Sequence, residues 1–449
     1  MGGARKLFGT DGIRGKAGVP PMTADTAQAV GRAVAEVCRQ GHDPMVAIGR
    51  DTRVSGNMLE TALSAGIRAM GVDAGLLGVL PTPGIAFAVR KLGAVAGVVI
   101  SASHNPFDDN GIKVFSSTGQ KLDDDMESRV ETLVLGPQSP AGKPARTGKT
   151  RDLAGTAADY CAFCRASVPP EITFKGLRVV LDCANGAAFQ VAPEVFKAMG
   201  AEVAVINAAP DGTNINRDCG SQHTGGLVRA VRETRADAGL AFDGDADRLI
   251  AVDETGRELD GDAILAVCAR DLLDRGALRN RTVVATQMSN LGLRLAMAGM
   301  GVRLLDAAVG DRHVLELMQK NGACLGGEQS GHVIFLGHHT TGDGIISGLQ
   351  LLAAVRRSGR KLSELAAIFR PAPQRLINVD VRDKPPLETI DSVRSAIRAA
   401  QEELGDSGRV LVRYSGTQMM CRVMVEAPDA ATTNRVAERV ADAVRAVLG

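Results

Sequence analysis

The sequence predicts an α/β protein with three similar α/β domains, built on mixed sheets, and a C-terminal α+β domain, all arranged around a central cleft. Three observations predict this class. Short apolar runs alternate with Ala- and Leu-rich segments that suit helices. Stretches rich in Pro, Gly and polar residues divide the chain. Near the C-terminus the pattern changes to the alternation that is typical of half-exposed strands.

Seven apolar runs are predicted to form buried strands, with helical segments between them: residues 45–49, 94–101, 177–184, 202–208, 238–244, 282–286 and 302–307. In the last part of the chain, residues 375–383, 409–415 and 421–427 predict antiparallel strands. A final helix places four apolar side chains on one face, Val436, Val440, Val444 and Leu448.

Breaks between these segments predict the domain boundaries. At roughly 100–200 residues per domain, 449 residues suggest two to four domains. Residues 136–150 have the composition of a linker, and further breaks lie near 253–261 and 370–374. The predicted domains are 1–150, 151–254, 255–370 and 371–449.

Composition excludes several classes of protein. A net charge of +1 argues against a nucleic-acid binder, which would show a basic face. The N-terminus lacks the apolar core of a signal peptide, and no apolar run is long enough for a membrane span. Only Cys161 and Cys164 of the eight cysteines form a C-x-x-C pair, which we predict on a helix rather than at a zinc site. We therefore expect a cytoplasmic protein with free thiols.

A hydroxyl-rich loop follows the strand predicted at 94–101. Alternation places Ser101 and Ser103 on the same side of its carboxyl end, where α/β sheets carry their active groups. Such a serine can be a nucleophile if a neighbour handles its proton, and His104 and Lys113 are the candidates. The alternative is a capped turn without a catalytic role.

Three carboxylates follow the strand predicted at 238–244. Asp243, Asp245 and Asp247 alternate along the chain, and a divalent cation with oxygen ligands, Mg²⁺ or Ca²⁺, would relieve their repulsion. A solvated turn is the alternative. An EF-hand is excluded because Arg248 stands where its loop requires glycine, although Glu254 falls at its twelfth position. Arg248 instead indicates an anion beside the metal.

A third candidate is the glycine-framed loop "GGEQSGH" at 326–332. Its backbone can approach a ligand closely, and its side chains suit a polyhydroxy molecule: Glu328, Gln329, Ser330 and His332. A polar turn is the alternative. The adjacent His338 and His339 are predicted to be a surface pair rather than a metal site.

Two further loops suit phosphate. "RYSGTQMMCR" combines hydroxyls, backbone N–H groups and guanidinium groups in Arg413, Ser415, Gly416, Thr417 and Arg422. "FGTDGIRG", at 8–15, offers Thr10 and Arg14. Each loop alone is a weak signal. Together, the five places indicate a cleft that holds a phosphorylated polar molecule, a metal and a serine.

The motifs "ISASHNPFDDNGIK", "DGDADR", "GEQSGH" and "RYSGTQ" together resemble the α-D-phosphohexomutase family, in order and over the whole chain. "FGTDGIRG" and the glutamine of "GEQSGH" are similar to the branch of that family that acts on glucosamine phosphates. The chain departs from the Pro-Ser-Gly-Thr-Glu-Pro loop of many members at three positions, Tyr414, Gln418 and Met419.

The resemblance implies roles for the candidate residues. Ser103 would be the phosphorylated serine, and its phosphate would share one Mg²⁺ with Asp243, Asp245 and Asp247. The other residues implied in catalysis are Arg14, His104, Lys113 and Arg248, of which Lys113 is the better candidate for proton transfer. The sugar would be held by Glu328, Ser330 and His332. The non-reacting phosphate would be held by Arg413, Ser415, Gly416, Thr417 and Arg422.

The implied reaction interconverts glucosamine 6-phosphate and glucosamine 1-phosphate through a phosphoserine enzyme and a sugar 1,6-bisphosphate. It would supply precursor for UDP-N-acetylglucosamine and cell-wall synthesis. The expected partner is a small sugar phosphate, with no nucleic acid and no membrane, and a homodimer is the candidate assembly. Three alternatives stay open: a phosphomannomutase or phosphoglucomutase of the same family, a phosphatase with an aspartyl nucleophile in "DGDAD", and a non-catalytic sugar-phosphate binder.

Overall fold

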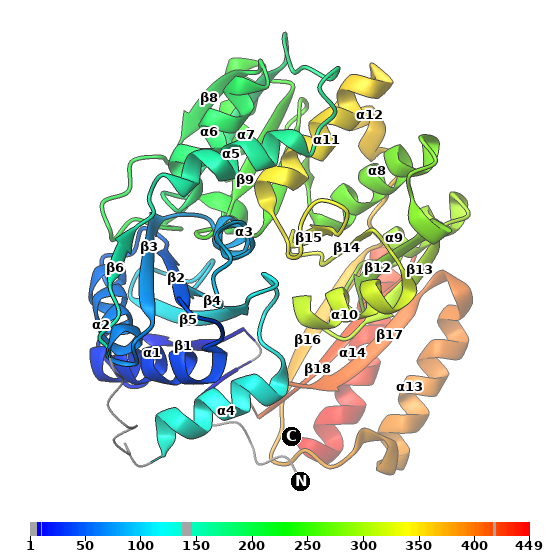
Figure 1. Cartoon of the computed structure of the whole chain (residues 1–449). Helices are drawn as coiled ribbons and strands as arrows, with labels where there is room; N and C mark the ends of the chain where they lie inside the picture. Colours follow the sequence, from blue (N-terminus) through cyan, green and yellow to red (C-terminus); the bar gives the residue numbers. More distant parts are fainter. Residues whose placement is uncertain (1–6, 10, 137–145, 416–418) are drawn as a thin grey trace. The chain divides into compact units, whose positions relative to one another are not determined.

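The computed structural model describes residues 7–9, 11–136, 146–415 and 419–449. The chain divides into two compact units. Unit 1 comprises Met1–Met288 and Val302–Ile368, and unit 2 comprises Ser289–Gly301 and Phe369–Gly449. Figure 1 shows the elements coloured along the chain. Within the described ranges, no helix is long and apolar enough to cross a membrane.

The first sheet of unit 1 has six strands in the order β1-β5-β4-β2-β3-β6. Their bounds are β1 (Ile13–Lys16), β2 (Met45–Arg50), β3 (Asp73–Val79), β4 (Ala96–Ile100), β5 (Asp109–Ser116) and β6 (Thr150–Asp152). The sheet is mixed, because β5 is antiparallel to both β1 and β4, whereas β4, β2, β3 and β6 run parallel. The helices in this part are α1 (Ala24–Cys38), α2 (Gly56–Ala69), α3 (Thr82–Leu92) and α4 (Asp124–Leu135).

Alternation along β2 and β4 divides these helices between the two faces of the sheet. Val46 and Ile48 pack in one apolar cluster with side chains of α1 and α2. On the opposite face, Ile85 of α3 contacts the position of Gly49. The serine loop therefore begins at the carboxyl end of β4, in a sheet whose two faces are both covered by helices.

Helices α1 and α2 pack so closely that Gly66 has no room for a side chain. A Cβ atom on Gly66 would lie 2.1 Å from the carbonyl oxygen of Gln28 and 3.0 Å from the amide nitrogen of Arg32. We predict that Gly66→Ala lowers the free energy of unfolding by about 1–3 kcal/mol, because backbone atoms must shift. Urea unfolding followed by circular dichroism measures this loss.

The matched control for Gly66→Ala is Gly299→Ala. Gly299 is also helical, and a Cβ atom there meets no described heavy atom within 4 Å. Alanine should be neutral or stabilise that position by up to about 1 kcal/mol, since it favours the helix. Equal effects of the two changes would show that the α1–α2 contact is not the cause.

The second sheet of unit 1 has the order β11-β10-β9-β7-β8. Its strands are β7 (Arg178–Asp182), β8 (Glu202–Ile206), β9 (Ala238–Phe242), β10 (Leu249–Asp253) and β11 (Glu258–Leu259). The associated helices are α5 (Thr156–Ala166), α6 (Ala188–Ala198) and α7 (Gly225–Thr234). Strands β9 and β10 form an antiparallel hairpin, whose connecting turn carries the three carboxylates.

The third sheet has the order β13-β12-β14-β15, with β14 antiparallel to β15. Its strands are β12 (Thr282–Thr286), β13 (Arg303–Ala307), β14 (Leu325–Gly327) and β15 (Val333–Phe335). The helices are α8 (Gly261–Asp274), α10 (Asp311–Asn321), α11 (Gly344–Ser358) and α12 (Leu362–Ala366). Asp260 and Asp343 accept hydrogen bonds from backbone N–H groups in the first turns of α8 and α11, so these side chains fix where the helices begin.

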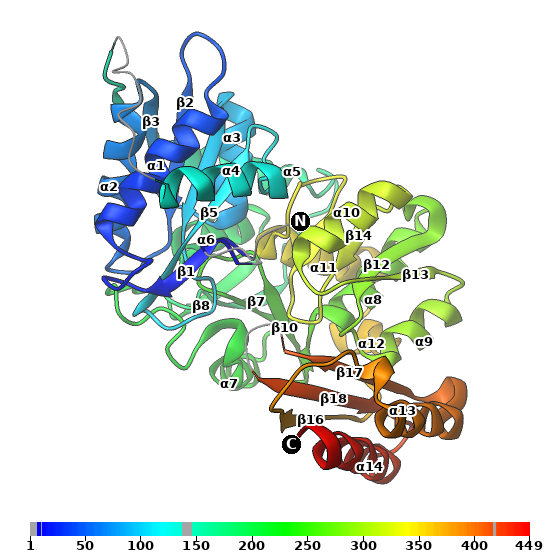
Figure 2. The same ribbon diagram turned by 90° about the horizontal axis from the view of Figure 1, so that it is seen from below.

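Unit 2 contains an antiparallel sheet in the order β16-β18-β17. Its elements are α9 (Leu291–Gly299), β16 (Gln374–Asp380), α13 (Asp391–Leu404), β17 (Arg409–Tyr414), β18 (Met420–Glu426) and α14 (Ala430–Leu448). Helices α13 and α14 lie on the same face of the sheet (Figure 2), where their apolar side chains join one core. Short 3₁₀ turns lie at Gly220–Gln222 and Arg279–Arg281 in unit 1 and at Leu387–Thr389 and Gly405–Ser407 in unit 2.

Helix α9 belongs to unit 2, although it precedes residues 302–368 of unit 1 in the sequence. The Leu291 N–H donates to the Glu426 carboxylate over 3.1 Å, and the Asn290 side chain accepts from the Ala372 N–H over 2.8 Å. Arg409 donates to the Ser289 carbonyl oxygen over 2.7 Å. Unit 2 thus includes a helix from an earlier segment of the chain, attached by side-chain hydrogen bonds.

The predicted fold class is confirmed, with mixed sheets in the α/β part and an antiparallel sheet at the C-terminal end. All seven predicted buried strands are present, within three residues of their expected ends. Cys161 and Cys164 lie on α5, as predicted, and every cysteine is a free, buried thiol. Most of the predicted linker at 136–150 lies outside the described residues.

Candidate active site

Ser103 lies in the loop that follows β4, and its side chain is buried. The backbone there is left-handed, with φ of 53°, a strained conformation for a non-glycine residue. Hydrogen bonds hold it: the Ser103 N–H donates to Ser101 Oγ over 2.9 Å, and its carbonyl accepts from Arg53 and Asn216 over 3.2 and 2.9 Å. The hydroxyl is therefore fixed in one direction.

A buried ion pair supports this loop from below. Arg53 Nη1 lies 3.0 Å from Asp51 Oδ2, and neither side chain is exposed. Ser101 Oγ donates to the same Asp51 oxygen over 2.6 Å. Arg53 also donates to the carbonyl of Asn105 over 2.6 Å. Ser101 is therefore a buried residue that supports the backbone of Ser103, and it does not lie at the surface of a cleft.

The three carboxylates lie in the turn between β9 and β10, and the Ser103 hydroxyl reaches them. Ser103 Oγ donates to Asp243 Oδ2 over 2.6 Å. Each of Asp243, Asp245 and Asp247 offers an oxygen within 4.8 Å of the others, and all three are buried. A side chain at Gly244 would place its Cβ 2.5 Å from the Ser103 carbonyl oxygen, so the close approach of the two loops requires glycine.

The carboxylate group suits a divalent cation. Asp245 Oδ1 and Asp247 Oδ1 are buried and have no hydrogen-bond partner among the described residues. Burial and the charges of Asp247 and Asp245 raise the pKa of Asp243 well above its usual range. A cation bound by these oxygens would give the two unpartnered atoms a ligand and would reduce the repulsion between the carboxylates. The donor set is the kind that Mg²⁺ or Ca²⁺ prefers. The strands on either side confirm that the turn is not an EF-hand loop.

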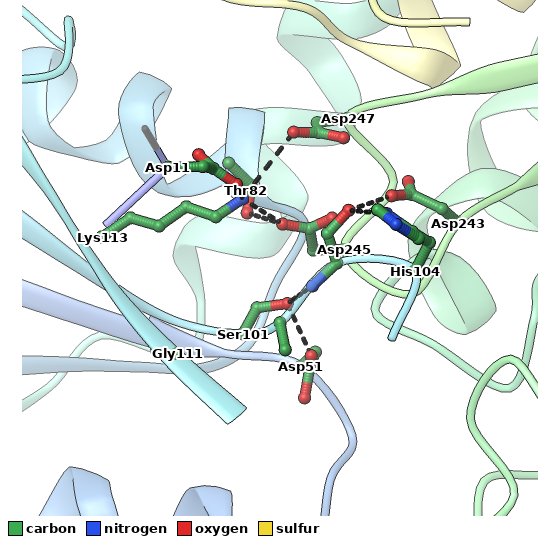
Figure 3. A network of polar contacts seen from close by, with 12 residues as sticks. Asp11, Asp51, Thr82, Ser101, His104, Gly111, Lys113, Asp243, Asp245 and Asp247 are labelled. Carbon is green, nitrogen blue, oxygen red and sulfur yellow. Dashed lines mark hydrogen bonds and ion pairs between the residues drawn. The ribbon is translucent and has the colours of Figure 1, made fainter. Parts of the chain in front are cut away.

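Lys113 approaches the carboxylates from β5. It lies opposite Val99 in the antiparallel β4–β5 pair, so strand pairing brings this lysine close to the loop that follows β4. Its Nζ lies 3.2 Å from Asp11, 3.0 Å from Asp245 and 3.9 Å from Asp247 (Figure 3). Burial alone would lower the pKa of Lys113, but these carboxylates outweigh it and raise the pKa far above the usual range. Lys113 is therefore a fixed cation.

His104 and Arg248 lie on the other side of Ser103. His104 Nδ1 lies 3.3 Å from Ser103 Oγ and 3.1 Å from Arg248 Nη1. The Arg248 N–H donates to Asp243 Oδ1 over 3.2 Å. Burial lowers the pKa of His104 to about 4, with help from Arg248 and Arg14, so this imidazole is neutral near pH 7. A neutral ring thus lies beside the serine, and a charged guanidinium lies beside that ring.

A cavity of about 650 Å³ opens beside these groups. Most predicted site residues of unit 1 line it: Arg14, His104, Asp247, Arg248, Glu328, Gln329, Ser330 and His332. Arg14 is held there by Asp11 and by the Ala102 carbonyl, 3.2 Å from its Nη1. Ser103 adjoins the cavity through its contact with His104. The volume suits a small polar ligand.

The loop "GEQSGH" supplies one wall of the cavity. Glu328 accepts a hydrogen bond from the Gly310 N–H over 3.1 Å, and Gln329 donates to Asp260 over 3.2 Å. His332 lies 3.5 Å from Asp247 and accepts from the Gly342 N–H over 3.2 Å. Burial disfavours the charged form of His332, whereas Asp247 and other nearby acids raise its pKa; the bond from Gly342 requires an unprotonated Nε2, so the proton of the ring lies on Nδ1, which faces Asp247. This loop therefore has contact with the carboxylate group.

The prediction of a surface pair at His338 and His339 is wrong for His339. His339 is fully buried, with Nε2 at 2.9 Å from the Pro83 carbonyl oxygen and Nδ1 accepting from the Thr340 N–H over 2.7 Å. Both ring nitrogens are satisfied, and burial lowers its pKa to about 4. His339 is a neutral residue of the interior.

The predicted phosphate loop lies in unit 2. Arg413 of β17 and Arg422 of β18 are directly opposite each other. Burial and the neighbouring Arg422 lower the pKa of Arg413. Ser415 is buried, and its carbonyl accepts from Lys384 over 2.6 Å. Four predicted residues, Thr10, Gly416, Thr417 and Gln418, lie outside the described residues.

Two facing guanidinium groups are suited to an anion. Tyr414, one of the departures from the common loop, donates from its hydroxyl to the Pro385 carbonyl oxygen over 2.7 Å. That contact anchors the side chain within unit 2.

Family models cover almost the whole chain. They are described as phosphoglucomutase/phosphomannomutase α/β/α domains I, II and III and the C-terminal domain, and they match residues 5–139, 158–256, 260–372 and 376–443. The chain belongs to the α-D-phosphohexomutase family. It is therefore an enzyme, an intramolecular phosphotransferase of the isomerase class.

Two full-length relatives place this phosphohexomutase in the phosphoglucosamine mutase branch. The chain is 52% identical to the phosphoglucosamine mutase of Syntrophobacter fumaroxidans over 446 residues, covering 99% of each protein. It is 52% identical to that of Anaeromyxobacter dehalogenans over 457 residues, covering 99% of this chain and 100% of the relative.

Solved structures share the fold. A phosphoglucomutase/phosphomannomutase family protein from Burkholderia thailandensis has a TM-score of 0.81 at 26% identity and covers 97% of both chains. The N-acetylphosphoglucosamine mutase of Aspergillus fumigatus, in complex with GlcNAc-6P and magnesium, has a TM-score of 0.71 at 19% identity, covering 99% of this chain and 96% of its own.

Three charged residues of this phosphohexomutase site were not predicted: Asp11, Lys121 and Asp311. Asp11 and Asp311 line the cavity, and Lys121 lies between them. Asp11 stands within "FGTDGIRG", where only Thr10 and Arg14 were singled out. Asp311 follows Gly310 at the start of α10, and a polar break directly after a predicted strand was the signal that could have identified it.

Proposed function

We propose that this phosphohexomutase interconverts glucosamine 6-phosphate and glucosamine 1-phosphate through a phosphorylated Ser103. The observation that carries the proposal is the 2.6 Å contact of the Ser103 hydroxyl with a buried carboxylate group that suits a cation. The choice of sugar is supported by the two relatives that are 52% identical over their full length and are named phosphoglucosamine mutases. The reaction would supply precursor for UDP-N-acetylglucosamine and for cell-wall synthesis.

The proposed reaction has two phosphoryl transfers. In the first, the P–O bond to Ser103 Oγ breaks as a P–O bond forms to the free hydroxyl of the sugar phosphate, and that hydroxyl loses its proton. The product is glucosamine 1,6-bisphosphate. The intermediate then turns over, and the phosphoryl group at its other end returns to Ser103. Phosphoryl transfer of this kind depends on positioning and on neutralised charge.

The residues around Ser103 suit these demands. Arg248 lies beside Asp243 and His104, where it can bind the phosphoryl oxygens. Of the two candidates for the proton, His104 lies next to Ser103 Oγ and is neutral, whereas Lys113, held as a cation 3.0 Å from Asp245, is suited to neutralising charge rather than to accepting a proton. Glu328, Ser330 and His332 line the same cavity and can bind sugar hydroxyls.

The proposed metal is one Mg²⁺, held by Asp243, Asp245, Asp247 and the phosphate on Ser103. When bound, it would supply positive charge to the transferred phosphoryl group. The support in this chain is the pair of buried oxygens on Asp245 and Asp247 that no described residue satisfies. Phosphoserine carries a charge of about −1.5 to −2 near neutral pH, which would strengthen the site.

The experiment that tests the function combines mass spectrometry with assay. A single phosphate on the Ser103 peptide that exchanges with glucosamine 1-phosphate and Mg²⁺ is the expected result. No phosphate, even after addition of the 1,6-bisphosphate, would favour the binder or phosphatase interpretation. Because the family models name phosphoglucomutase and phosphomannomutase, glucose 1-phosphate and mannose 1-phosphate are assayed in parallel. A higher kcat/KM for either would reassign the sugar.

We predict that Arg413→Ala raises the KM for sugar phosphate by roughly 10- to 100-fold and changes kcat little, as expected for loss of a charge-assisted bond worth about 1.5–3 kcal/mol. The reason is that Arg413 faces Arg422 and would bind the non-reacting phosphate. Steady-state kinetics measures both constants.

The control for this prediction is Arg375→Ala. Arg375 lies on β16 of the same sheet, and its half-exposed side chain is 3.8 Å from Glu438. Its loss should leave KM unchanged. A collapse of kcat at constant KM in Arg413→Ala would mean that the arginine acts on the transferred phosphoryl group instead.

A further inference from the structure

Six buried or half-buried ionisable side chains of unit 1 form a closed ring in which acidic and basic groups alternate. In order, the members of the ring are Asp11, Lys113, Asp247, His332, Asp311 and Lys121. They come from five places in the sequence, and the ring includes one of the three carboxylates of the proposed metal site.

Lys121 makes the two shortest contacts of the ring. Its Nζ lies 2.5 Å from Asp11 Oδ1 and 2.7 Å from Asp311 Oδ2. Burial alone would lower the pKa of Lys121, but Asp311 and Asp11 outweigh it and raise the pKa. The lysine is therefore charged, and it joins a loop near the N-terminus to the first residue of α10.

The partners of Lys121 continue to the reacting groups. Asp11 lies 3.2 Å from Lys113, and Asp311 lies 3.8 Å from His332. Lys113 and His332 in turn contact the carboxylate group, at 3.0 Å from Asp245 and 3.5 Å from Asp247. Each of these two basic side chains thus has one acid on the metal side and one acid on the Lys121 side.

Lys121 itself is not among the residues that line the cavity of the active site. We propose that Lys121 is a positioning residue for the phosphoryl transfer: it holds Asp11 and Asp311, which keep Lys113 and His332 directed at the carboxylate group. This inference rests on the proposed function. Without Lys121, two carboxylates would lose their common cation, and they would move apart or become protonated.

A second contact indicates that the fold survives loss of Lys121. Arg312, the residue after Asp311, donates to Glu127 and to the Leu122 carbonyl oxygen, each over 2.7 Å, and also binds Asp124. The start of α10 therefore stays attached to the segment around α4. Loss of Lys121 should change the direction of side chains in the site more than the packing of the unit.

The test is Lys121→Met, which keeps the length of the side chain and removes its charge. We expect kcat to fall roughly 10- to 100-fold, the size of effect that small misplacement of reacting groups produces, while KM changes less than about threefold. In the Mg²⁺-free protein, amide hydrogen exchange at residues 309–313 should become faster. Adding Asp311→Asn should restore part of kcat, because it removes the negative charge of a carboxylate that has lost its lysine partner.

Lys16→Met is the matched control. Lys16 also pairs with an aspartate, at 2.8 Å from Asp108, but its side chain is 68% exposed and lies outside the ring. The Lys16→Met substitution should leave kcat, KM and amide hydrogen exchange unchanged. A normal kcat per folded molecule in Lys121→Met, or a raised KM with normal kcat, would overturn the proposal.

Failure of the variant to fold and failure of the proposed function can each be distinguished from failure of the positioning role. If Lys121→Met does not fold, Lys121→Arg tests the positioning role instead. The guanidinium group keeps the positive charge, but its planar shape changes the geometry of the contacts with the two carboxylates. A loss of kcat at constant KM and melting temperature is then expected, and a normal kcat refutes the role. If the wild type does not turn over glucosamine phosphates, the proposed function fails, and faster exchange at 309–313 still reports on the ring.

Discussion

Ser103→Ala should abolish turnover and leave the protein folded. The hydroxyl is the group that would accept and return the phosphoryl group, and it donates to Asp243 of the carboxylate group. Loss of a covalent nucleophile typically lowers kcat by about a millionfold, so the residual rate should lie at the background. Coupled assay of glucosamine 1-phosphate formation measures the loss, and a thermal melt checks the fold.

The control for this variant is Ser101→Ala in the same loop. Ser101 donates to Asp51 and accepts from the Ser103 N–H, so its removal should loosen the loop and reduce kcat by at most about 100-fold. The peptide that carries Ser103 should still bear phosphate. Near-normal activity of Ser103→Ala, in protein free of wild-type enzyme, would refute the mechanism.

Asp243→Asn should be the second most damaging change. Asp243 accepts from Ser103 Oγ and from the Arg248 N–H, and it is one of the three carboxylates that would hold Mg²⁺. An amide keeps the shape but removes one negative ligand. Since the metal contributes several kcal/mol to the transition state, kcat should fall roughly a thousandfold at fixed Mg²⁺. Isothermal titration with Mg²⁺ should show weakened binding.

Asp253→Asn separates loss of a metal ligand from damage to the hairpin. Asp253 lies at the end of β10, is buried, and accepts hydrogen bonds from Thr255 and Arg257. Its variant should melt at a lower temperature and keep the Mg²⁺ dependence of the wild type. If Asp243→Asn bound Mg²⁺ normally, the carboxylate group would not be the metal site.

Strong local patterns explain which parts of the fold could be predicted. Residues 45–49 and 282–286 are continuous apolar runs, and they form β2 and β12. Strand β3 was missed because "DAGLLGV" contains two glycines, and β14 because "LGG" is too short to show a pattern. Such strands form because their neighbours supply the pairing, so tertiary contacts override weak local preference.

In the candidate site, too, the local motifs could be predicted and the contacts between distant segments could not. Each cluster of polar residues was visible locally, but the contact between Ser103 and Asp243 spans 140 positions of sequence, and no periodicity reports it. The motifs together indicated one shared cleft, but only the family resemblance implied that the phosphate on Ser103 shares a metal with Asp243. Lys121 was overlooked because a single lysine after a turn is typical of a solvated surface, and its burial depends on Asp11 and Asp311 from distant segments.

The place of α9 in unit 2 has a consequence for the order of events during synthesis. The ribosome makes residues 289–301 before residues 302–368, yet their partners Ala372 and Glu426 come later still. The nascent chain must therefore carry α9 with its apolar side unmatched while the third sheet is completed. A separately expressed piece that begins at Phe369 would lack this helix and expose the surface that it covers. A piece that begins at Ser289 would include it at the cost of a long excess segment, so joining 289–301 to 369–449 through a short artificial connection is the better route to an isolated C-terminal fold.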